Sequence, residues 1–130
     1  MWARWRNLSS QREISGQRGG ELAMSKILSL PDRPTAVLAS NDLMAIGAMR
    51  KIKEKGLRIP QDISVIGLDD IFMASTVDPP LTTINLPRYE IGETAWKLLM
   101  YSIQHKEEMG REVTVDTRLV VRGTTGRAVP

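Results

Sequence analysis

Short apolar segments alternate with amphipathic segments of helix length, and this alternation restricts the fold more than any other feature of the sequence. Four segments have the character of strands: residues 35–40, 63–67, 81–86 and 113–122. Three others have apolar residues at helical spacing: residues 22–30, 43–55 and 87–105. Strands alternating with such helices predict an α/β fold, with a parallel sheet flanked by helices. Because only one short helix precedes the first strand, we expect a sheet that is incomplete at its beginning.

The predicted elements differ in how much of their surface they should bury. The apolar run 35–40 is typical of a strand covered on both faces. The helix at 87–105 has an inward face, made by Ile91, Ala95, Leu98, Leu99 and Ser102. It also has a second apolar stripe, made by Tyr89, Trp96, Met100 and Ile103. Together the two stripes make an apolar surface wider than a helix that packs on one sheet requires.

The excess positive charge lies at the N-terminus. The net charge is +3, and three arginines are the only charged residues in the first twelve, which leaves 15 basic and 15 acidic residues in the remainder. A DNA-binding surface needs a concentrated basic face, so we expect no direct DNA contact by this chain. Residues 1–12 are interpreted as an irregular basic leader, with Gly19 and Gly20 ending the irregular part. Because Trp2 and Trp5 are interleaved, contact of this leader with nucleic acid or a membrane surface is the alternative to a frayed terminus.

Several function classes lack the residues that they need. The absence of cysteine excludes disulfides, thiolate zinc sites and a cysteine nucleophile. The single histidine, His105, follows a helix among charged residues, where a solvated side chain is expected rather than a general base. No glycine-rich phosphate motif is present. We therefore expect no enzyme, no cofactor and no metal. Without a signal peptide or an apolar run of ~20 residues, the expected compartment is the cytoplasm, with no membrane contact.

Polar residues follow the predicted strands where an open parallel sheet binds ligands, at the carboxyl ends. Asn41 and Asp42 follow the first strand, Asp69 and Asp70 follow the second, and Asn85 lies near the end of the third. Amide and carboxylate groups together suit the vicinal hydroxyls of a sugar or the edge of a purine. The alternative is structural, with Asn41 as a helix cap and the aspartates as turn residues. Adjacent aspartates near a strand end point in opposite directions, which argues against a shared magnesium ion.

Several motifs occur in a fixed order: PTAVLASNDLMAIGAM (34–49), GLRIPQDISVIGLDD (56–70), PPLTTI (79–84), PRYEIG (87–92) and LVVRGTT (119–125). This set resembles the C-terminal half of lactose-repressor-type (LacI/GalR family) regulators, from about residue 20 to residue 125. The resemblance implies a partial periplasmic-binding-protein-like (type I) fold. It also implies that Asn41 and Asp69 contact the effector, with Asp42, Asp70 and Leu86 as further lining. Leu86 stands where many members have an effector-facing glutamine.

The resemblance further implies an incomplete domain. Residues 13–130 correspond to a truncated effector-binding and dimerisation domain, the C-terminal subdomain plus a crossover helix at 87–105, without a helix-turn-helix. Family dimers pair partly through the helix that starts at Leu43 and Met44 and through residues 71–77. The second stripe of helix 87–105 packs on the N-terminal subdomain in the family, so here it would be bare. We therefore expect a homodimer, with an association surface formed by Leu43, Met44, Tyr89, Trp96, Met100 and Ile103.

The sequence thus predicts a ligand-sensing and dimerisation fragment of a sugar- or nucleoside-responsive transcriptional regulator, with a small-molecule effector as its partner. The alternative is a fragment of a periplasmic sugar-binding protein that serves a transporter.

Overall fold

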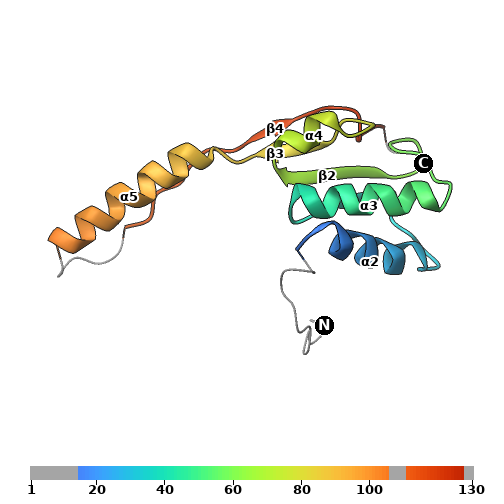
Figure 1. Ribbon diagram of the computed structural model, residues 1–130, viewed down its shortest axis with the longest axis horizontal. Helices are drawn as coiled ribbons and strands as arrows, with labels where there is room; N and C mark the ends of the chain where they lie inside the picture. The colour runs from blue at the N-terminus through green and yellow to red at the C-terminus, as the bar shows by residue number, and fades with distance from the viewer. Residues whose placement is uncertain (1–14, 106–110, 128–130) are drawn as a thin grey trace.

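The structure, a computed structural model, describes residues 15–105 and 111–127. Figure 1 shows helices and strands in the order α2 (Gln17–Leu28), β1 (Ala36–Leu38), α3 (Asp42–Glu54), β2 (Ser64–Asp69), α4 (Phe72–Thr76), β3 (Thr82–Asn85), α5 (Arg88–Gln104) and β4 (Arg118–Val120). The leader at 1–12 lies outside the described residues.

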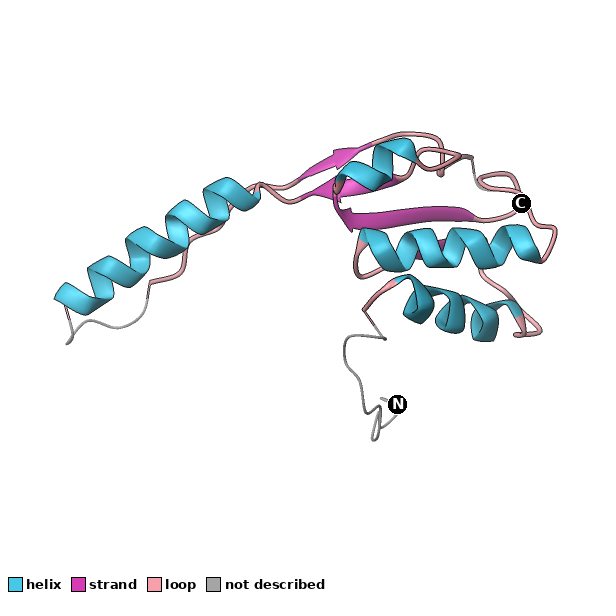
Figure 2. Cartoon of the chain, in the orientation of Figure 1, coloured by secondary structure: helices cyan, strands magenta, loops and turns pink. Residues whose placement is uncertain are grey.

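The strands form one sheet in the order β1-β2-β3-β4 (Figure 2). β1, β2 and β3 are parallel, with Leu38 beside Ile66 and Asp69 beside Asn85. β4 runs antiparallel to β3, so the sheet is parallel except at this edge. Only three residues of the predicted strand at 113–122 belong to β4. The structure confirms an α/β fold with a mostly parallel sheet.

The core lies between one face of the sheet and the helices α2 and α3. Its buried apolar members are Met24, Ala45, Ala48, Met49, Ile52, Ile59, Ile63, Val65, Ala74 and Leu81. No described helix packs over the opposite face, where Leu38 keeps 68% of its surface exposed. The expectation that residues 35–40 are covered on both faces was therefore wrong. The short apolar run could not show that a covering layer was missing.

Glycines allow α2 and α3 to approach closely. Gly19 and Gly20 are buried within α2 and do not end an irregular leader, which corrects the prediction for this segment. A Cβ atom at Gly20 would lie 2.0 Å from the carbonyl oxygen of Met44 in α3. A Cβ atom at Gly47 would lie 1.9 Å from the carbonyl oxygen of Gln17. Glycine is therefore required on both helices because backbone lies against backbone.

Helix α5 projects away from the sheet (Figure 1). None of its residues is buried, and both apolar stripes are open. The predicted inward face, which includes Ile91 and Leu99, therefore covers nothing within the described residues, a correction to the sequence interpretation. The spacing of apolar residues predicted the helix correctly, but it could not indicate which surface the helix would meet.

Residues 122–126 join the amino-terminal ends of β2 and β3. The Thr82 N–H donates to Oγ1 of Thr124, which in turn donates to the Val65 carbonyl oxygen, at 2.8 and 2.6 Å. The Val65 N–H donates to the Thr124 carbonyl oxygen at 2.8 Å. Thr124 is fully buried. The Thr124 hydroxyl therefore bridges β2 and β3 between Val65 and Thr82.

We expect Thr124→Val to lower the free energy of unfolding by about 1–3 kcal/mol, because it leaves the Thr82 N–H and one bond of the Val65 carbonyl unsatisfied in the interior. Urea unfolding followed by circular dichroism measures the loss. Thr125→Val is the matched control, since the Thr125 hydroxyl bonds only the Thr82 hydroxyl, and there the loss should be smaller. Equal losses for the two variants would contradict this assignment.

Candidate functional site

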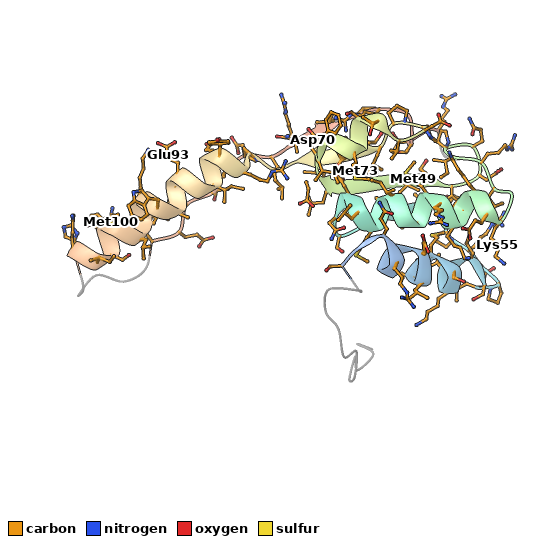
Figure 3. All side chains as sticks on the ribbon, viewed as in Figure 1. Met49, Lys55, Asp70, Met73, Glu93 and Met100 are labelled. Carbon is orange, nitrogen blue, oxygen red and sulfur yellow. The ribbon has the colours of Figure 1, made fainter. Side chains whose placement is uncertain are left out.

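The predicted site residues gather at the carboxyl edge of the parallel strands. Asp69 ends β2, and its register partner Asn85 ends β3. Asn41 precedes α3, just beyond β1. Asp70 follows β2 and lies at the end of the sheet from which α5 departs (Figure 3). The polar residues predicted from the sequence therefore lie at the same edge of the sheet.

Asn41 caps a helix. Its Oδ1 accepts a hydrogen bond from the Met44 N–H at 2.8 Å, and its Nδ2 donates to the Ser15 carbonyl oxygen at 2.9 Å. Asparagine at this position satisfies a backbone donor that the helix leaves unpaired. The structure therefore confirms Asn41 as a helix cap, and its contact with an effector stays a prediction. The residue is only partly exposed, and both ends of its amide are already in use.

Asp42 is buried inside the fold and does not line the surface of the polar edge. Its carboxylate is fully buried and accepts hydrogen bonds from the Thr83 hydroxyl, at 2.5 Å, and from the Ile71 N–H, at 2.8 Å. Gly67 lies directly against it, because a Cβ atom there would be 2.1 Å from Oδ1 of Asp42. Asp42 therefore joins α3, β3 and the segment after β2, and it supports the edge from beneath.

Asp70 is held by an ion pair that the sequence analysis did not anticipate. Its Oδ1 lies 2.6 Å from Nη2 of Arg122, and its Oδ2 accepts from Nδ2 of Asn85 at 2.9 Å. The hydrogen bond from Arg122 is the main cause that lowers the pKa of Asp70. Asp70 has a φ of 56°, a left-handed conformation that aspartate tolerates. Its carboxylate is therefore committed to the fold.

Asp69 has a different environment from the other aspartates. Its φ of 122° lies in a region that residues with a side chain rarely adopt. Its carboxylate is partly exposed and has no hydrogen bond or ion pair within residues 15–105 and 111–127. Burial, and next the charge of Asp42, raise the pKa of Asp69, while the charge of Arg88 lowers it. A strained acceptor without a partner at a strand end is the strongest indication of ligand binding here.

Two arginines near the edge were missed by the sequence analysis. Arg122 pairs with Asp70, and Arg88 begins α5 close enough to act on Asp69. The only signal for Arg122 was a basic residue at the end of an apolar strand. Leu86, the expected lining residue, is partly exposed between β3 and α5. In the part of the chain that the structure describes, no acidic or histidine cluster suits a metal ion, and no helix is long and apolar enough to span a membrane.

The fold is that of an α/β domain, and its polar edge lies at the carboxyl ends of the parallel strands, where open sheets of this kind place their ligand sites. The chain belongs to the periplasmic binding protein-like domain family, whose model matches residues 3–125. It is similar to the HTH-type transcriptional repressor CytR of Escherichia coli K12, with 45% identity over 111 residues, which cover 85% of this chain and 32% of the repressor. The chain thus spans about a third of the length of this curated relative.

Solved structures give the same result. A LacI family transcriptional regulator from Enterococcus faecium with bound ribose matches with a TM-score of 0.71 and 37% identity, over 85% of this chain and 40% of that one. The lac repressor dimer bound to operator and an anti-inducer matches with a TM-score of 0.76 and 39% identity, over 85% and 38%. These relatives are regulators rather than enzymes, which agrees with the expectation from the sequence. The periplasmic-binding-protein-like fold is confirmed.

Proposed function

We propose that residues 13–130 are the C-terminal, effector-binding and dimerisation part of a sugar- or nucleoside-responsive transcriptional regulator of the LacI family that acts in the cytoplasm. The similarity to CytR and to a ribose-bound regulator supports the class. The observation that carries the proposal is Asp69, a partly exposed carboxylate with a strained backbone and no partner in the described chain.

The geometry suits the recognition of hydroxyl groups. A carboxylate can accept two hydrogen bonds, so Asp69 would hold a pair of sugar hydroxyls. Asp42 accepts a hydrogen bond from the Ile71 N–H and Asp70 one from Arg122, and these contacts hold in place the chain that directly follows Asp69. Such a rigid support holds a binding group in its productive orientation before the ligand arrives. Asn41 would add a contact through the lone pair of Oδ1 that the helix cap leaves free.

Asp69→Gly is expected to abolish effector binding while raising the free energy of unfolding by about 1 kcal/mol, since glycine adopts a positive φ without strain. The probes are ribose, cytidine and adenosine at millimolar concentration, followed by ¹H–¹⁵N chemical shifts. Urea unfolding measures stability. We expect small shifts with one of these compounds at the Asn41 and Asp69 amides of the unmodified chain and none in the variant.

Asp32→Ala is the matched control, because Asp32 is an exposed aspartate in the turn after α2, away from the carboxyl edge. It should leave both binding and stability unchanged. Shifts that persist in Asp69→Gly would move the effector site elsewhere. Absence of shifts at this edge with all three compounds would contradict the proposal for this chain.

We further propose that α3 and α4 form the dimerisation surface. Phe72 and Met73 of α4 and Leu43 of α3 are 83%, 40% and 38% exposed, and Met44 is partly exposed. A hollow beside them is lined by residues of α3 and of the segment after α4: Ile46, Met49, Arg50, Lys53, Glu54, Val77 and Asp78. Apolar side chains beside a hollow suit a self-complementary contact. The similar lac repressor structure is itself a dimer.

A further inference from the structure

Two successive residues at the end of β2 have positive φ angles, which residues with a side chain rarely adopt. φ is 122° at Asp69 and 56° at Asp70. Aspartate tolerates the value at Asp70, in the left-handed helical region, better than the value at Asp69. A strained conformation of this kind persists only where the surrounding structure holds it. Contacts from elsewhere in the fold must therefore fix the backbone at Asp69.

The carboxylate of Asp42 contacts the chain on both sides of Asp69. Two residues before Asp69, Gly67 lies directly against Asp42, since a Cβ atom there would be 2.1 Å from Oδ1. Two residues after Asp69, the Ile71 N–H donates a hydrogen bond to Oδ2 of Asp42 at 2.8 Å. One buried carboxylate therefore fixes the chain where it enters the strained pair and where it leaves it.

Asp42 is itself held rigidly. It is the first residue of α3, it is fully buried, and its Oδ1 accepts a hydrogen bond from the Thr83 hydroxyl at 2.5 Å. Both carboxylate oxygens are therefore bonded, one to β3 and one to the segment after β2. Hydrogen bonds to a charged acceptor are stronger than those between neutral groups. The end of β2 is thus set against a fixed point in the interior.

The carboxylate of Asp69, in contrast, is left open. It is partly exposed and has no hydrogen bond or ion pair in the described part of the chain, whereas the carboxylates of Asp42 and Asp70 are both bonded. The φ angle of a residue sets the direction in which its Cα–Cβ bond leaves the preceding chain. Relaxation of Asp69 to an extended φ would therefore turn its carboxylate in another direction. The strained conformation determines where the open carboxylate points.

We propose that Asp42 is a positioning residue of the effector site, which holds Asp69 in its strained conformation through the contacts with Gly67 and Ile71. This inference rests on the proposed role of Asp69 in effector binding. Asp42 would touch no ligand and would act through Asp69. Support of this kind keeps a binding group in its productive geometry before the ligand arrives.

Urea unfolding of paired substitutions tests whether Asp42 holds the strain. Asp69→Asn removes the charge of Asp69, and Asp69→Gly removes the charge and also allows a positive φ without strain. The difference between their urea midpoints therefore reports the strain, separated from the repulsion between the charges of Asp69 and Asp42. We expect the higher midpoint for Asp69→Gly. In a chain that also carries Asp42→Ala, this advantage should be lost, because residues that act on one another are not additive.

Nuclear magnetic resonance gives a direct measurement of φ at Asp69, through the three-bond coupling between its amide and α protons. This coupling is small at a φ of 122° and large for an extended residue. We expect a small coupling in the unmodified chain and in Asp42→Asn, which keeps an oxygen acceptor for the Ile71 N–H, and a large one in Asp42→Ala. Where Asp42→Ala does not fold, Thr83→Val replaces it in both measurements. It removes one of the two hydrogen bonds that orient Asp42 and should have the same effects to a smaller extent.

Asp70→Asn is the control, because it weakens the ion pair with Arg122 and leaves the contacts of Asp42 in place. It should keep both the small coupling at Asp69 and the advantage of Asp69→Gly. An undiminished advantage without Asp42, or a coupling that stays small without it, would overturn the proposal. Relaxation of Asp69 in Asp70→Asn would also overturn it. Neither measurement uses a ligand, so a failure of this inference is distinct from a failure of effector binding at the same edge.

Discussion

Gly47→Ala is expected to lower the free energy of unfolding by about 3 kcal/mol or more, enough to unfold much of a marginally stable domain. The added methyl group would lie 1.9 Å from the carbonyl oxygen of Gln17, and that atom belongs to a helix backbone that cannot rotate away. α2 and α3 would have to separate, which opens the core around Met24. Urea unfolding and thermal unfolding, both followed by circular dichroism, measure the loss.

Gly92→Ala is the control for this prediction. Gly92 lies in the exposed helix α5, and a Cβ atom there would meet nothing within 4 Å. Alanine favours a helix interior by up to about 1 kcal/mol over glycine, so this variant should gain stability or stay unchanged. The same substitution thus has opposite effects at two helical positions. A Gly47→Ala protein as stable as the unmodified chain would show that α2 and α3 are not in backbone contact.

Asp42→Ala is expected to cost about 3 kcal/mol of unfolding free energy, because the Thr83 hydroxyl and the Ile71 N–H both lose a charged acceptor in the interior. The substitution also leaves a cavity beneath Gly67. Asp42→Asn keeps an oxygen acceptor and should lose less. Removing the charge should also lower the pKa of Asp69, since the charge of Asp42 contributes to raising it. Chemical denaturation tests the first effect, and carboxyl ¹³C titration tests the second.

Asp32→Ala again serves as the exposed control and should change stability little. Equal stability of Asp42→Ala and Asp32→Ala would contradict the role assigned to the buried carboxylate. Because Asp42 is fully buried, it does not contact a ligand itself, and its loss should affect binding through the fold and through the pKa of Asp69.

The sequence predicted the strands and the polar edge because those signals are local. Apolar runs mark β2 and β3, and the polar residues that follow them lie at one edge by the geometry of parallel strands. The sequence did not predict the hydrogen-bond partners of Asp42 and Asp70. These partners, Thr83 and Arg122, lie 41 and 52 residues further along the chain. Tertiary pairing, rather than local preference, distinguishes the three aspartates.

Gly19 and Gly20 show a different limit. Paired glycines usually interrupt a helix, since each costs about 1 kcal/mol relative to alanine, and this favoured the prediction of an irregular leader. At Gly20, close packing against Met44 outweighs that preference, and only the position of α3 reveals it. In the same way, the spacing of apolar residues correctly predicted the wide apolar surface of α5, but it could not indicate which surface this helix would meet.

The hydroxyl of Thr124 has a consequence for how the polypeptide acquires its structure during synthesis. Its partners Val65 and Thr82 precede it by 59 and 42 residues, so a nascent chain that contains every other strand still lacks the group that joins β2 to β3. Contacts this remote in sequence are entropically costly and form late. Until residue 124 can pair with them, Thr82 and Val65 keep backbone groups unpaired, and a sheet in that state is prone to aggregate.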